Sequence, residues 1–158
     1  PGKKLLFMGQ EFGQLREWSE ERELDWYLLE EDSHRHLQEF VSDLLHMYTK
    51  YPALYANDKG YEGFQWVNAN DGDRSIFSFI RWSPTGRNNF TPVARPDYMC
   101  GVPKLKQYRL ILDSEDEKYG GSSIGRPKVY RSKKGECDGQ PYRIAYDLPA
   151  FGVAVFTF

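Results

Sequence analysis

The sequence has few cysteines, no long apolar run and no strong excess of charge, and each shortage excludes a class of protein. Its two cysteines, Cys100 and Cys137, are too few for a disulfide framework or a zinc motif, and a reduced cytosolic pair is the simpler interpretation. No stretch approaches the roughly 18 apolar residues of a membrane span, and no cleavable hydrophobic segment follows the N-terminus. We therefore expect a cytoplasmic protein with no membrane partner.

The charges are balanced and dispersed. The formal net charge is −2 at pH 7, and lysines and arginines are spread along the chain, so the sequence predicts no nucleic-acid partner. His34 and His36 are two positions apart and would lie on different faces of a helix, which argues against a metal site. No H-E-x-x-H motif is present. We expect no metal and no cofactor.

Length and composition indicate a globular piece of a larger architecture. With 40% hydrophobic and 28% charged residues, the chain can bury one good core or two small ones. A complete (β/α)8 barrel takes about 250 residues, so a barrel strand here would belong to something longer, and the start at Pro1 also suggests a fragment. Aromatic residues reach 16%; they fill β-cores most often, but they also stack on sugar rings.

The stretch Lys4–Gln14 is the most informative segment. Leu5–Met8 form a continuous apolar run ended by Gly9, which is typical of a parallel strand covered on both faces. Glu11 follows at once, and substrates are met at the carboxyl ends of parallel strands in α/β folds. The alternative is that Leu5–Met8 are ordinary core and Glu11 is a solvated loop charge.

Residues 15–31 are dense in acidic and aromatic side chains and hold no helical or strand period. Connections of this length in compact domains tend to be functional loops. Carboxylates accept hydrogen bonds from sugar hydroxyls, and the rings of Trp18 and Trp26 could stack on sugar faces. The pattern favours a polyhydroxylated ligand, unless both tryptophans are pinned into the protein and the acids face water.

A helical period begins after this segment. Apolar residues recur on one face at Leu37, Phe40, Val41, Leu44, Leu45 and Tyr48. We predict an amphipathic helix over 33–51, with Ser33 as its N-cap and Pro52 ending it.

The pattern changes to short β-segments after Asn57–Gly60, and we place a domain boundary there. Alternating aromatic or β-branched side chains predict strands over 61–67, 75–82, 107–113, 129–132, 142–148 and 152–158. Strands at this spacing suggest an antiparallel sandwich or Greek-key domain. Residues 114–126 are predicted to form an exposed loop.

Motifs along nearly the whole chain share one resemblance. They are Pro1–Gln14, Arg16–Trp18 and Leu24–Trp26, and further on Asn89–Val93, Arg95–Tyr98, Gly101–Pro103, Leu112–Ser114, Tyr119–Gly121 and Leu148–Ala150. Together they resemble the C-terminal region of bacterial-type 1,4-α-glucan (glycogen) branching enzymes of the α-amylase superfamily. The resemblance implies an α+β fragment: the last β/α unit of a (β/α)8 barrel in residues 1–57, with its last strand, long loop and last helix, followed by an all-β C-terminal sandwich domain in residues 58–158.

The resemblance also implies an activity. Such enzymes cleave an α-1,4 bond and transfer the freed chain to a 6-hydroxyl, and a retaining mechanism of this kind needs two carboxyl groups about 5 Å apart. The motifs that supply those groups are not in this sequence, so we assign no catalytic residue and expect the fragment alone to be inactive. Its expected partners are an α-glucan and the upstream barrel of the same polypeptide.

The resemblance suggests roles for a few residues near the active-site rim. Glu11 would order the loop rather than act as nucleophile or acid. Together with Glu11, four residues are candidates for shaping the substrate groove: Gln14, Trp18, Asp25 and Trp26.

One departure from the family pattern stands out. A further apolar strand would precede Phe90, but Asn89 runs directly into it. We expect these residues to be omitted from the sequence rather than lost, because a central strand is hard to delete from a sandwich. An alternative function for the whole chain is an α-glucan-binding or purely structural β-sandwich module.

Overall fold

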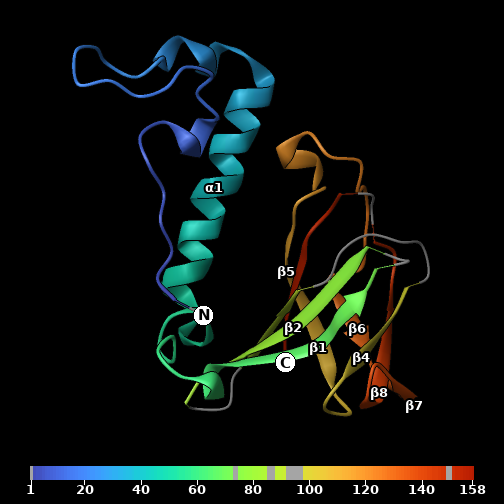
Figure 1. Cartoon of the computed structure of the whole chain (residues 1–158). Coiled ribbons are helices and arrows are strands. Elements are labelled where there is room, and N and C mark those ends of the chain that lie inside the picture. The colour runs from blue at the N-terminus through green and yellow to red at the C-terminus, as the bar shows by residue number, and fades with distance from the viewer. Residues whose placement is uncertain (1, 73–74, 85–87, 92–97, 149–150) are drawn as a thin grey trace.

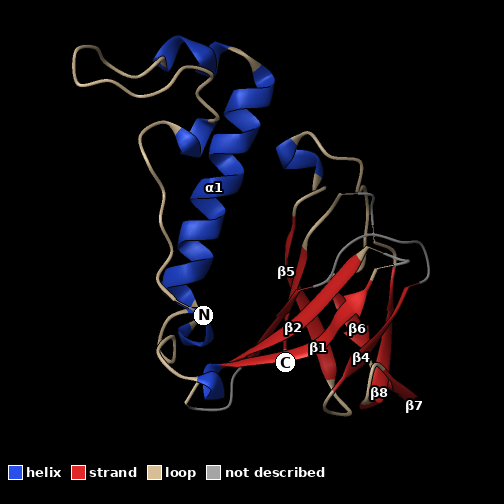
Figure 2. Ribbon diagram, in the orientation of Figure 1, coloured by secondary structure: helices blue, strands red, loops and turns tan. Residues whose placement is uncertain are grey.

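One long helix stands beside a two-sheet β-sandwich (Figure 1). The computed structural model describes residues 2–72, 75–84, 88–91, 98–148 and 151–158. The N-terminal segment runs along the helix, and the strands occupy the C-terminal part of the chain (Figure 2). In the described part of the chain, no helix combines the length and apolarity needed to cross a membrane.

The predicted helix is confirmed as α1, Asp32–Lys50. Ser33 lies inside it and is not the N-cap: Glu31 occupies that position, and its side chain makes no capping hydrogen bond. The helix ends at Tyr51, whose backbone is extended, because Pro52 disfavours the helical conformation in the residue before it. The described residues also form short 3₁₀ turns: η1 Gln10–Phe12, η2 Trp26–Glu30, η3 Pro52–Leu54, η4 Tyr61–Gly63 and η5 Glu117–Tyr119.

The described strands all pair antiparallel, in two sheets. The larger sheet has the order β1-β2-β3-β9-β5-β6, and the smaller has the order β4-β8-β7. Their bounds are β1 Phe64–Asp71, β2 Ile76–Trp82, β3 Asn88–Thr91, β4 Tyr98–Val102, β5 Gln107–Asp113, β6 Val129–Arg131, β7 Lys133–Cys137, β8 Gln140–Tyr146 and β9 Ala154–Thr157.

The core lies between these sheets. Side chains alternate between core and solvent along the strands, as in β5, so each sheet contributes one face. The larger sheet supplies Ile76, Ile80, Tyr108, Leu110, Ala154 and Phe156, and the smaller supplies Tyr98, Cys100, Val102, Ile144 and Tyr146. The prediction of an antiparallel sandwich is therefore confirmed.

Most of the predicted strands occur, with shifted ends for β1, β8 and β9. Sequence analysis missed β3, β4 and β7, and part of the predicted loop 114–126 forms η5. β7 was missed because it is a charged edge strand, and such strands lack an apolar face by which to recognise them.

Leu5–Met8, which were predicted as the last strand of a barrel, form no strand in this structure. Leu5 is 85% exposed, and the next three side chains are about half exposed. A strand of a parallel sheet forms only by hydrogen bonding to neighbouring strands, and the described residues provide none beside this segment. What the described residues form is an all-β domain of two sheets with one long helix beside it.

The junction between Asn89 and Phe90 lies inside β3, which occupies the sheet position between β2 and β9. The larger sheet is thus continuous through residues on both sides of the junction. Parts of the family-like motifs, at residues 92–97 and 149–150, lie outside the described residues.

Candidate functional site

The predicted groove residues belong to a loop that packs on the N-terminal half of α1. Gly9 and Gly13 both have positive φ, 86° and 69°, and they reverse the chain on either side of η1. The Phe12 carbonyl lies 2.7 Å from Nδ1 of His34 on α1, and the Phe12 side chain is fully buried. The first turn of the loop is therefore anchored to the helix.

Asp25 and Gln14 hold the loop closed. Asp25 is only 3% exposed, and it accepts hydrogen bonds from Nε of Arg16, at 2.8 Å, and from the guanidinium Nη2. The backbone N–H of Asp25 donates to Oε1 of Gln14 at 2.8 Å, while Nε2 of Gln14 donates to the Arg16 carbonyl at 2.9 Å. The hydrogen bonds from Arg16 lower the pKa of the Asp25 carboxyl. The Asp25 carboxylate is therefore ionised, and its oxygens are already hydrogen-bonded to Arg16.

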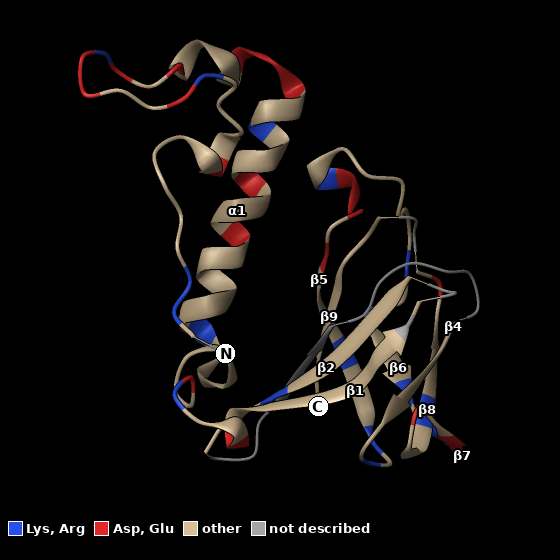
Figure 3. Ribbon diagram, viewed as in Figure 1, with Lys and Arg blue, Asp and Glu red and all other residues tan. Residues whose placement is uncertain are grey.

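The two tryptophans present partly exposed rings. Trp18 is 37% exposed and meets Phe7 edge-on at 5.6 Å, and Trp26 is 47% exposed and lies against Phe12 at 5.0 Å. Each ring is thus supported on one side and open on another. Glu11 is half-buried on η1. In Figure 3 the ribbon between η1 and η2 is coloured as acidic at several positions, with basic positions among them. The structure brings the five predicted residues into one loop without making a pair of free carboxylates.

A second aromatic surface, which the sequence analysis did not assign, lies on β1 and β2. Phe64, Trp66 and Phe79 form a three-ring cluster with centroids 5.0 to 5.8 Å apart. Trp66 is 51% exposed, and neighbouring Phe77 is 54% exposed. Aromatic residues at alternate positions of two adjacent strands were the available signal, because such residues point to the same face of a sheet.

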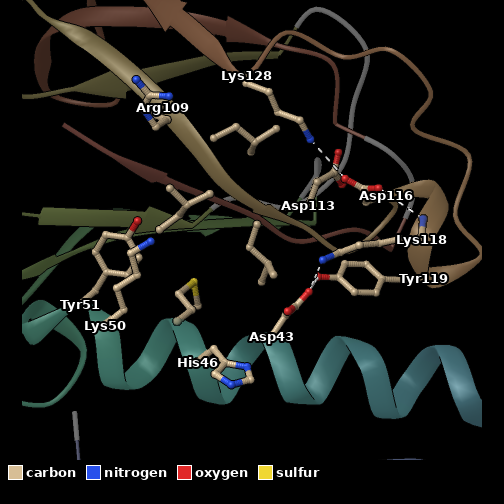
Figure 4. Close-up of a pocket in the computed structure, with 14 residues that line it drawn as sticks. Asp43, His46, Lys50, Tyr51, Arg109, Asp113, Asp116, Lys118, Tyr119 and Lys128 are labelled. Carbon is tan, nitrogen blue, oxygen red and sulfur yellow. Dashed lines mark hydrogen bonds and ion pairs between the residues drawn. The ribbon is translucent and has the colours of Figure 1, made fainter.

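A cleft separates α1 from β5 (Figure 4). Its volume is about 410 Å³. At one end Asp43 of α1 accepts hydrogen bonds from Nζ of Lys118 and from the Tyr119 hydroxyl, and the Tyr119 ring meets Phe40 edge-on at 5.1 Å. These contacts connect the helix to the sandwich.

The electrostatics of this contact follow from burial and pairing. Hydrogen bonds from Lys118 and Tyr119 lower the pKa of Asp43, and burial raises the pKa of Tyr119 to about 12. Asp43 is therefore a permanent acceptor near neutral pH, and Tyr119 a permanent donor. Within the described ranges, no group of three His, Cys, Asp or Glu side chains could hold a metal ion.

This architecture matches a known protein family and a group of relatives. A family model described as "Alpha amylase, C-terminal all-beta domain" matches residues 66–158. The chain is 50% identical over 163 residues to a 1,4-alpha-glucan branching enzyme GlgB of Butyrivibrio fibrisolvens, covering 99% of this chain and 26% of that protein. Proteins of the same name from Pseudomonas putida and Aquifex aeolicus are 43% and 42% identical, over 98% and 97% of this chain and 22% and 25% of their own lengths. The chain thus spans about a quarter of these relatives.

Solved structures share the fold at low identity. The catalytic module of the multi-modular glycogen-degrading pneumococcal virulence factor SpuA, in complex with an inhibitor, matches with a TM-score of 0.50 and 11% identity, over 85% of this chain and 20% of that one. The Group B Streptococcus pullulanase SAP matches with a TM-score of 0.50 and 12% identity, over 86% and 18%. At this identity the likeness concerns the fold alone.

Proposed function

The chain belongs to the family of alpha amylase C-terminal all-beta domains, and from this premise we propose that it is the C-terminal part of a 1,4-α-glucan branching enzyme. Identities of 42% to 50% to relatives of that name, over nearly the whole chain, support the proposal. The complete enzyme would cleave α-1,4-glucan chains and transfer them to form α-1,6 branches in glycogen. Neither Cys100 nor Cys137 forms a disulfide, which agrees with a reducing cytoplasm.

The catalytic carboxylates would lie in the upstream three quarters of the polypeptide. Retaining transfer needs two carboxyl groups about 5 Å apart, one of them protonated. In this chain, Asp25 is paired with Arg16, and Asp43 is paired with Lys118. Neither can serve as a free nucleophile. Because the family's catalytic motifs are also not in this sequence, the isolated chain should not turn over glucan.

Residues 1–57 would complete the catalytic barrel and residues 58–158 would form the C-terminal domain. The observation that carries this proposal is the exposed apolar strip Leu5–Met8 beside α1. The strip borders an apolar groove of about 930 Å³ that includes Leu44, Leu45 and Tyr48 of the helix. An exposed apolar surface of this kind needs a cover. We infer that the preceding barrel strands and helices cover it and convert residues 5–8 into the last barrel strand.

The loop after that strand would then stand at the rim of the active site. Trp18 and Trp26 would stack on glucose units, with Glu11 beside them. Gln14 and Asp25 would act indirectly, by keeping the loop in the shape that presents the rings.

A chimera tests the proposal. The corresponding C-terminal quarter of the Butyrivibrio enzyme is replaced by this chain, and α-1,6 linkages formed from amylose are measured. We expect an active chimera, because half of the residues are identical. Leu6→Asp should abolish activity by placing a charge in the buried strand, whereas Leu105→Asp, at a 53% exposed leucine of the β4–β5 loop, should not.

An inactive chimera made from an active parent, or equal effects of the two substitutions, would contradict the barrel assignment. Branching by the 158-residue chain alone would show that the catalytic groups are not upstream.

A second candidate function is α-glucan binding by the sandwich itself. The supported, half-exposed ring of Trp66 in the β1–β2 cluster favours it, because such rings stack on sugar faces. Titration of the chain with maltoheptaose should show saturable binding that Trp66→Ala removes. Phe151→Ala, at a 99% exposed ring, is the control. If neither variant changes the binding, this surface is not the glucan site.

A further inference from the structure

The cleft between α1 and β5 holds more accessible positive than negative charge (Figure 4). Four cationic side chains line it: Lys50, Arg109, Lys118 and Lys128. Three carboxylates also line it: Asp43, Asp113 and Asp116. The question is which of these charges remain available to a ligand.

All three carboxylates are engaged. Asp43 and Asp116 pair with two of the lining lysines. Asp113 is 5% exposed; it accepts a hydrogen bond from the Tyr146 hydroxyl at 3.0 Å and pairs at 3.5 Å with Arg126, which does not line the cleft. The charge of Asp113 is therefore balanced from outside the cleft.

Two of the four cationic side chains have no carboxylate partner among the described residues. Among the residues that the structure describes, no carboxylate lies within ion-pair distance of Arg109 or Lys50. Arg109 is held in register on β5, opposite Thr157 of β9 on one side and Val129 of the edge strand β6 on the other. Lys50 is in the last turn of α1, across the cleft. A concave site with two unmatched cations on opposite walls attracts an anion.

The remaining wall is apolar and aromatic. Met47 and Ile111 are half-buried and line the cleft. Tyr51 lies at the same end as Lys50 (Figure 4), and Nζ of Lys50 lies over the Tyr51 ring, 5.7 Å from its centroid. We propose that the cleft binds a free hexose phosphate: Arg109 and Lys50 hold the phosphate, and the sugar ring lies against Met47 and Ile111. Guanidinium and ammonium groups are the usual phosphate ligands, and the volume suits a small metabolite. The ligand is distinct from glucan, which carries no charge.

Calorimetric titration of the full 158-residue chain with glucose 6-phosphate tests the proposal, with inorganic phosphate and glucose as further probes. We expect saturable, salt-sensitive binding of glucose 6-phosphate and weaker binding of the other two. Arg109→Gln should weaken binding at least tenfold, since a charge-assisted hydrogen bond is lost. Because Arg109 is exposed, the variant should unfold at the same urea concentration as the parent chain.

Lys134→Gln is the matched control: it removes an exposed charge on β7, outside the cleft. It should leave the affinity unchanged. Equal losses in the two variants would reduce the effect to general electrostatic attraction and overturn the site. Equal affinity for inorganic phosphate would overturn the role of the sugar, and equal affinity for glucose would overturn the role of the charge. None of these results bears on branching activity, which the chimera tests separately.

Discussion

The strongest test of how the helix is attached to the sandwich is the loss of Arg81. This β2 side chain is buried, and its Nε donates to the Ala53 carbonyl in η3 at 3.2 Å. Its Nη2 pairs with Asp58, and Asp58 also pairs with Nζ of Lys4 at 3.0 Å. One guanidinium thus joins the sheet, the turn after α1 and the N-terminal segment.

Replacing Arg81 by Met keeps most of the volume but leaves Asp58 and the Ala53 carbonyl without this donor. Removing one partner of a buried ion pair costs about 3–5 kcal/mol. Lys4 remains as a half-exposed partner, so we expect the lower end, about 3 kcal/mol. Burial by itself would raise the pKa of Asp58, yet the hydrogen bonds from Arg81 and Lys4 outweigh burial and lower the pKa, so Asp58 is the charged partner of this pair.

Urea unfolding measures the loss. With a slope of about 2 kcal/mol/M for a domain of this size, Arg81→Met should lower the unfolding midpoint by about 1.5 M. The control Arg109→Met removes an exposed arginine from β5 and should change the free energy of unfolding by less than about 0.5 kcal/mol. Combining Arg81→Met with Asp58→Asn should cost less than the sum of the two single changes, because the charge that Arg81 leaves unpaired is then absent.

Two results would refute this reasoning. A loss below about 0.5 kcal/mol for Arg81→Met would mean that the pair contributes nothing net. Strict additivity in the double variant would mean that Arg81 acts through packing alone.

Three further predictions follow from single contacts. Asp25→Asn should open the 9–31 loop, seen as faster amide hydrogen exchange there with an unchanged sandwich; unchanged exchange would contradict the closing role. The pKa of Asp43 is below its usual 3.8, so the contribution of this carboxylate to the free energy of unfolding is complete above pH 3.8 and is lost as the pH falls through the lower folded value. Asp43→Asn should therefore flatten the pH dependence of stability below about pH 4. A curve identical to that of the parent chain would contradict this prediction. Gly101→Ala should destabilise the chain strongly, because the added Cβ would lie 2.1 Å from the Cys137 carbonyl oxygen. The control is Gly72→Ala, whose added Cβ meets no atom within 4 Å. Equal unfolding midpoints for the two variants would show that β4 and β7 can separate at Gly101.

Local patterning in the sequence was enough to predict α1 and the central strands of the sandwich. Helical period and a following proline are properties of neighbouring residues, so the 33–51 prediction differs from α1 by one residue at each end. β2 and β5 were predicted nearly residue for residue, because aromatic and β-branched alternation marks a strand with one buried face. The family motifs likewise depend on residue identity alone.

Tertiary structure decided which groups meet. Leu5–Met8 have the composition of a buried strand but form none, since a strand exists only with partners to pair with. Whether Asp25 is a substrate ligand or a loop-closing residue depended on Arg16 folding back onto it.

The cleft was likewise invisible in the sequence. Lys50 and Arg109 are far apart along the chain, and nothing local predicts that they face each other across one cavity. Hydrophobic period is a short-range signal that the chain carries in its own order, whereas the pairing of charges depends on distances that exist only after the helix has packed beside the sheet.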